Sequence, residues 1–130
     1  MSAIEAWKRL VRAHHNQSIS KQESYDPSSD FWRPFTSFFH ADPLRTDDMV
    51  LERLIQKVKP EETVLDVGGG GGRFALPLAL NCRHVTVVEP SESMLSVLQD
   101  VASETGIENL NIVQSSWEEA KVKCADAVLC

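Results

Sequence analysis

Five consecutive glycines, Gly68 to Gly72, constrain the fold of this chain more than any other feature. They directly follow the short apolar run 63–67, and they directly precede a segment with apolar residues at helical spacing. An apolar, β-branched run is typical of a buried parallel strand, and glycines at its end permit positive φ and close approach of a ligand. One or two glycines would suffice for a structural turn, so the sequence predicts a strand, a ligand-binding loop and a helix.

Strand and helix patterns alternate from residue 62 to the end of the chain. Strands are predicted at 63–67, 84–88, 111–114 and 125–130. One helix follows the glycines, and a second is predicted between a Ser91 cap and a terminating Gly106. This order predicts an α/β fold with a parallel sheet and flanking helices. Since a central parallel strand needs neighbours on both sides, the sheet of about four strands is expected to be incomplete and truncated at its C-terminal end.

We therefore expect the chain to be a fragment of one roughly twice as long, inactive by itself and weakly cooperative in thermal unfolding. Two domains are predicted, with a helical and aromatic segment at 1–60 and the sheet at 61–130. A Ser2–Glu5 capping box predicts a helix over about 3–15, followed by a loop at 16–29.

A second helix is predicted to begin at Asp42-Pro43 and to end before Pro60. Asp47 and Asp48 are interpreted as first-turn residues of a helix, where the helix dipole explains them. Between the two helices lies a dense aromatic stretch from Tyr25 to Phe39. It is expected either to pack as a layer on the sheet or to form a lid over a bound ligand.

Composition narrows the class of protein. The formal net charge of −6 argues against a nucleic-acid-binding surface, because phosphate contacts need clustered Lys and Arg. No apolar run approaches the about 20 residues that span a bilayer. The cysteines at 82, 124 and 130 have no zinc spacing, so no metal site is predicted. They are expected to be reduced, mostly buried thiols of a cytoplasmic protein.

Two carboxylates narrow the choice of ligand. Residues 70–75 satisfy a variant of the dinucleotide fingerprint, so the glycines alone leave an NAD-binding domain open. Asp66, two residues before Gly68, is poorly placed beside a pyrophosphate but well placed for a cationic ligand, directly or through water. Glu89 closes the strand 84–88, where its two oxygens can accept from both hydroxyls of a ribose, as in NAD-binding domains.

Three segments together resemble the class I, Rossmann-like methyltransferases that use S-adenosylmethionine. Residues 64–73 look like that family's first motif, 87–95 like its second-strand motif, and 125–130 like its fourth strand. The resemblance implies that 61–130 is the S-adenosylmethionine-binding half of an enzyme that methylates an unidentified acceptor, expected to be a small molecule. The alternatives are an NAD-dependent oxidoreductase domain and a non-catalytic cofactor-binding module.

The resemblance also implies roles for residues of the first two motifs. Backbone groups around Gly68 and Gly70 would hold the amino-acid end of the cofactor, and Asp66 would support its ammonium group. Glu89 would take the ribose hydroxyls.

The remaining implied contacts concern the adenine. Pro90 and Met94 would pack near it. After the third strand the family often has an acidic residue, but Ser116 and Trp117 stand there in this chain. Ser116 is expected to accept from the adenine amino group, and Trp117 either covers the adenine face or is a core residue. No catalytic residue is predicted, since no side chain can be assigned as a general base.

Overall fold

The computed structural model describes residues 1–19 and 29–130, which form two compact units. In the first unit, Met1–Phe31, the structure describes helix α1 (Ala3–Ile19), the two residues before it and residues 29–31. The second unit, Trp32–Cys130, contains the sheet. No helix of the described residues is long and apolar enough to cross a membrane.

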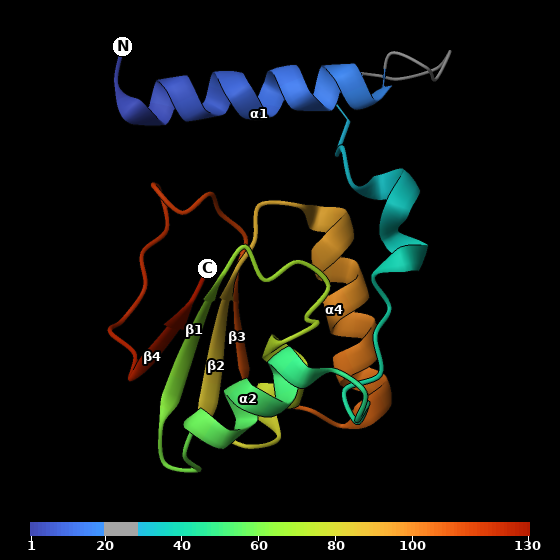
Figure 1. Cartoon of the computed structure of the whole chain (residues 1–130), viewed down its shortest axis with the longest axis vertical. Helices are drawn as coiled ribbons and strands as arrows, with labels where there is room; N and C mark the ends of the chain where they lie inside the picture. The colour runs from blue at the N-terminus through green and yellow to red at the C-terminus, as the bar shows by residue number, and fades with distance from the viewer. Residues whose placement is uncertain (20–28) are drawn as a thin grey trace. The chain divides into compact units, whose positions relative to one another are not determined.

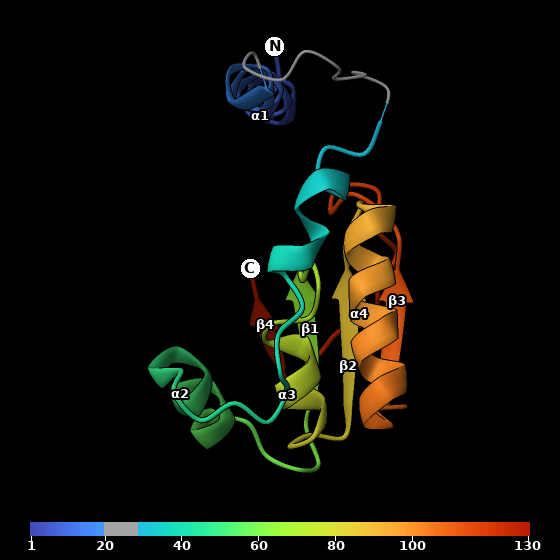
Figure 2. The ribbon, with the colours of Figure 1, turned by 90° about the vertical axis from the view of Figure 1, so that its right-hand side faces the viewer.

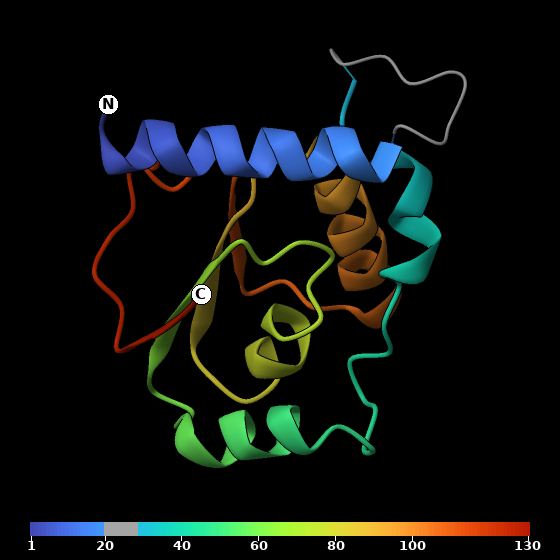
Figure 3. The same ribbon diagram turned by 45° about the horizontal axis from the view of Figure 1, so that its top comes forward.

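The sheet has four parallel strands in the order β3-β2-β1-β4. These are β1 (Thr63–Val67), β2 (His84–Val88), β3 (Leu110–Val113) and β4 (Ala127–Leu129). Helix α3 (Ala75–Ala79) connects β1 to β2, and α4 (Glu92–Thr105) connects β2 to β3. Figure 2 shows both helices against the same face of the sheet, and Figures 1 and 3 show α4 (orange) beside the strands. The Rossmann-like α/β prediction is thereby confirmed.

The core fills the space between the sheet and these helices. Val85 and Val87 of β2 are fully buried, as are Leu78 of α3 and Leu98 of α4. Most residues of β1 and β2 are buried, which agrees with the nearly continuous apolar runs that predicted buried parallel strands. This packing fixes where each strand ends, and so positions the loops that follow β1 and β2.

Helix boundaries follow the capping residues, with one correction to our predictions. Ser91 caps α4 by accepting from the N–H of Met94 at 3.1 Å, and Gly106 ends it with φ 68°, both as predicted. The predicted start of the second helix at Asp42 is wrong. Asp42 instead forms a local turn by accepting from the N–H of Leu44, and α2 (Met49–Lys57) begins after Asp48, its N-cap.

Other boundaries and the cysteines also differ in part from the predictions. Helix α1 begins at the Ser2–Glu5 capping box as expected but continues to Ile19, four residues beyond the predicted end. Strand β4 is shorter than the predicted 125–130.

Only Cys82 is buried, whereas the other two thiols are exposed, which corrects the expectation of mostly buried cysteines.

Residues 33–57 belong to the same compact unit as the sheet. The 3₁₀ helix η1 (Arg33–Phe38) contacts α4, and α2 contacts α3. Trp32 and Phe39 meet edge to face with ring centroids 5.6 Å apart. No residue of η1 is buried, and Phe38 is 81% exposed. Packing of the aromatic stretch as a layer on the sheet, its action as a lid and a functional boundary near residue 60 therefore all stay predictions. Tyr25 lies outside the described residues.

Candidate functional site

The glycine loop leaves the carboxyl end of β1 in a conformation that only glycine adopts readily. Gly68 has φ +75°, and its N–H donates to the carbonyl of Val88 at 2.7 Å. A Cβ on Gly68 would meet no atom within 4 Å, so this backbone faces open space. At Gly72, with φ +88°, a Cβ would lie 2.8 Å from the side chain of Leu76. The loop is therefore packed at its end and open at its start, where a ligand could approach the backbone.

Asp66 and Glu89 lie at the ends of neighbouring strands and are both buried, with exposed fractions of 6% and 7%. Burial, followed by the negative charge of Glu89, raises the pKa of Asp66 to about 6. Oxygen Oε2 of Glu89 accepts from the N–H of Gly70 at 3.0 Å, and Oε1 accepts from the N–H of Ser91 at 2.8 Å. Glu89 thus fastens the glycine loop to the start of α4, a role that its position in the sequence does not reveal.

The other predicted cofactor residues lie along the same edge of the sheet. Met94 is buried, and its Cε lies 3.0 Å from where a Cβ on Gly70 would be, so it supports the loop. Pro90 is exposed directly after Glu89. Ser116 and Trp117 form the turn after β3, and Trp117 is 52% exposed, which contradicts its reading as a core residue.

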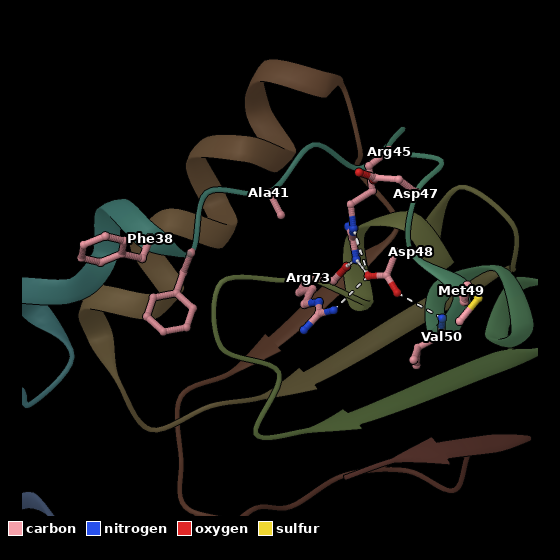
Figure 4. A pocket seen from close by; sticks show the side chains of 9 residues that line it. Phe38, Ala41, Arg45, Asp47, Asp48, Met49, Val50 and Arg73 are labelled. Carbon is pink, nitrogen blue, oxygen red and sulfur yellow. Dashed lines mark hydrogen bonds and ion pairs between the residues drawn. The ribbon is translucent and has the colours of Figure 1, made fainter.

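A polar cluster that the sequence did not predict adjoins the end of the loop (Figure 4). Asp48 lies between Arg45 and Arg73 and forms ion pairs with both, at 2.9 and 3.1 Å. A pocket of about 640 Å³ opens beside it. Its lining combines charged and apolar side chains from three segments: Phe38, Phe39, Ala41, Arg45, Asp47, Asp48, Met49, Val50 and Arg73. Two features of the sequence could have indicated this cluster. They are the helical pattern that begins after Asp48 and the position of Arg73 directly after the glycines.

The site therefore combines an accessible glycine backbone with two buried carboxylates. Such an arrangement favours a ligand that carries positive charge and hydroxyl groups, because each would find an acceptor of the required kind.

Residues 64–130, more than half of the chain, match the family described as methyltransferase domain. The chain belongs to this family. This membership agrees with the resemblance of the sequence motifs to methyltransferases. It argues against the alternative that the chain is an NAD-dependent oxidoreductase domain.

Curated relatives of this methyltransferase domain include enzymes with different acceptors. The ubiquinone biosynthesis O-methyltransferase of Rickettsia canadensis is 36% identical over 87 residues, which are 62% of this chain and 36% of that protein. The ribosomal RNA small subunit methyltransferase G of Ralstonia nicotianae is 38% identical over 81 residues, which are 60% of this chain and 34% of that protein. The chain thus spans about a third of the length of these relatives.

Among solved structures, the methyltransferase domain is similar to phosphoethanolamine N-methyltransferase 1 of Haemonchus contortus, solved with phosphoethanolamine and S-adenosylhomocysteine. The TM-score is 0.59 at 18% identity, and the match covers 98% of this chain and 26% of that one. At this identity the similarity shows a shared fold.

Proposed function

We propose that the chain binds S-adenosylmethionine at the carboxyl edge of its sheet and serves an enzyme that transfers the methyl group to a small molecule. The observation that carries the proposal is the open space beside Gly68, next to the buried carboxylates of Asp66 and Glu89. Gly68 and Gly70 would hold the amino-acid end of the cofactor, with Asp66 beside its ammonium group. Glu89 would accept from the ribose hydroxyls.

The adenine would lie toward the turn after β3. Trp117 would cover its face, Ser116 would accept from its amino group, and Pro90 and Met94 would border it from the start of α4. When bound, the cofactor supplies the reactive methyl carbon. The residues of this chain contribute its alignment and the surrounding charge, which are the main sources of catalysis in such a displacement.

Two features support a small-molecule acceptor. The net charge of −6 disfavours binding to a phosphate backbone. The pocket of about 640 Å³ beside Arg73 has the size and mixed lining of small-molecule sites. We also propose a cytoplasmic location, which the three free cysteines support.

Calorimetric titration of the chain with S-adenosylhomocysteine and, separately, with NAD tests the cofactor proposal. We expect saturable binding of the first and none of the second. Gly68→Ala should weaken binding at least tenfold, because its Cβ would occupy the space beside the loop. Gly106→Ala is the matched control, since Gly106 also has positive φ, at +68°, and open surroundings but lies at the far end of α4.

Both alanine variants should lose about 1 kcal/mol of stability from the left-handed backbone. Only Gly68→Ala should lose affinity, and equal affinity of the two variants would overturn the proposed site. NAD binding without S-adenosylhomocysteine binding would contradict the cofactor assignment. Salt-sensitive binding of ribosomal RNA fragments at physiological ionic strength would contradict the small-molecule acceptor.

A further inference from the structure

Asp48 joins the segment before the sheet to the end of the glycine loop, and its two oxygens have separate partners (Figure 4). Oxygen Oδ1 accepts from the N–H groups of Val50 and Leu51, both at 3.1 Å, which caps α2. Oxygen Oδ2 accepts from Nε and Nη2 of Arg45 at 3.2 and 2.9 Å, and from Nη2 of Arg73 at 3.1 Å. One oxygen thus begins a helix, while the other binds two guanidinium groups.

The pair between Asp48 and Arg45 is largely shielded from solvent. The side chains are 10% and 15% exposed, whereas that of Arg73 is 63% exposed. The N–H of Leu51 and the guanidinium of Arg45 hold the pKa of Asp48 well below its usual range. A two-donor contact between guanidinium and carboxylate with this burial restricts geometry far more than an exposed ion pair does.

The same segment contacts the backbone at the end of the loop. Nη2 of Arg45 also donates to the carbonyl oxygen of Arg73 at 2.8 Å. Arg73 directly follows Gly72. Two residues earlier, a Cβ on Gly71 would lie 2.9 Å from the carbonyl oxygen of Phe39. The end of the glycine loop is therefore held by residues that belong neither to the glycine run nor to the sheet.

We propose that Asp48 is a positioning residue for cofactor binding, acting through Arg45 and Arg73 to hold the end of the glycine loop. The inference rests on the function proposed above. Ordering the backbone of a residue costs conformational entropy, and a run of five glycines has unusual freedom to lose. Contacts that order the loop before the ligand arrives remove part of this entropy loss from binding.

Asp48→Asn separates the two tasks of the side chain. Asparagine caps helices as well as aspartate does, so α2 should persist, while the charge that binds the two arginines is lost. We expect the Kd for S-adenosylhomocysteine to rise about tenfold, equivalent to one hydrogen bond to a charged group. Asp42→Asn is the matched control, because it removes an exposed charge from the same segment and preserves a turn that Asn also forms.

A double-mutant cycle with Arg73→Gln distinguishes positioning from general destabilisation. If Asp48 and Arg73 act together, the double variant should bind no more weakly than the weaker single variant. Leu54→Ala, which weakens the packing of α2 without touching the cluster, should lower the unfolding midpoint and leave the Kd within twofold of wild type.

Unchanged affinity of Asp48→Asn would overturn the inference, as would additive effects in the cycle or an equal loss of affinity in Leu54→Ala. These results leave wild-type binding intact and so leave the proposed function standing. Failure of the wild-type chain to bind S-adenosylhomocysteine would instead overturn the proposed function itself, together with this inference.

Discussion

Asp66 should reduce the stability of the chain in the absence of ligand, so replacing it by asparagine should stabilise the fold while weakening the site. Burial and the charge of Glu89 raise its pKa from 3.8 to about 6. A carboxyl group with a raised pKa in the folded state binds its proton more tightly there than in the unfolded chain. Ionisation of Asp66 therefore lowers the free energy of unfolding as the pH rises from 3.8 through about 6. Asp66→Asn removes this loss of stability.

The size of the effect follows from the two pKa values. A tenfold change in an equilibrium constant is about 1.4 kcal/mol, so a pKa raised from 3.8 to about 6 lowers stability by about 3 kcal/mol at pH 7.5. At pH 5.0 Asp66 is mostly protonated in the folded state but mostly ionised in the unfolded state, and the penalty is about 1.5 kcal/mol. The advantage of Asp66→Asn should thus fall by about half between these pH values.

Urea unfolding of wild type and Asp66→Asn at pH 7.5 and 5.0, followed by circular dichroism, measures this difference. Carbon NMR of the aspartate carboxyl groups gives the pKa of Asp66 directly, without requiring a two-state transition. Asp126→Asn is an informative control on the same strand pair. Its carboxylate accepts from the N–H and hydroxyl of Thr63, which lower its pKa, so this variant should be destabilised at pH 7.5 and less so as the pH falls.

Asp66→Asn should also weaken S-adenosylhomocysteine binding by at least tenfold, because it removes the charged group that we propose beside the ligand's ammonium group. The reasoning is refuted if Asp66→Asn is less stable than wild type at pH 7.5, or if its advantage does not shrink toward pH 5.0. A measured pKa of Asp66 near 3.8 would refute it as well.

Two further predictions concern the start of α4 and the turn after β3. Ser91→Ala should lower the free energy of unfolding by about 1 kcal/mol in urea titrations, since it removes the cap that accepts from the N–H of Met94; a neutral effect would contradict this role. Trp117→Ala should leave the unfolding midpoint unchanged, because Trp117 is 52% exposed, and should weaken S-adenosylhomocysteine binding about tenfold by loss of base stacking. Unchanged affinity of Trp117→Ala would remove this residue from the adenine site.

The order of the elements could be predicted because each carries a local signal. The alternation of β-branched runs with 3.6-residue patterns marked the four strands and the helices between them. Ser91 and Gly106 marked both ends of α4 because capping depends on the residue itself and its nearest backbone. The start of α2 was misplaced because Asp42-Pro43 and Asp48 are both plausible caps. In the structure Asp48 caps α2 and also pairs with Arg73, a tertiary contact without a sequence signal, whereas Asp42 forms a local turn.

The site was predictable to the same extent. Asp66 lies near the end of β1 and Glu89 directly follows β2, and consecutive strands of such a fold are usually neighbours, so their proximity could be inferred. The hydrogen bonds from the N–H groups of Gly70 and Ser91 to Glu89 could not be inferred, because they depend on how the glycine loop folds back. The cluster at Asp48 depends on a contact between residues 25 positions apart, for which no sequence period exists.

The charges of the site explain why one class of ligand is preferred. Two buried carboxylates at adjacent strand ends repel each other, and this repulsion contributes to the raised pKa of Asp66. A ligand with a pyrophosphate would add negative charge beside them, whereas an ammonium or sulfonium group would relieve the repulsion. We therefore expect a bound cation to offset the loss of stability that Asp66 causes in the free chain. We therefore expect the charge of the two carboxylates to favour a cationic ligand independently of any contact with adenine.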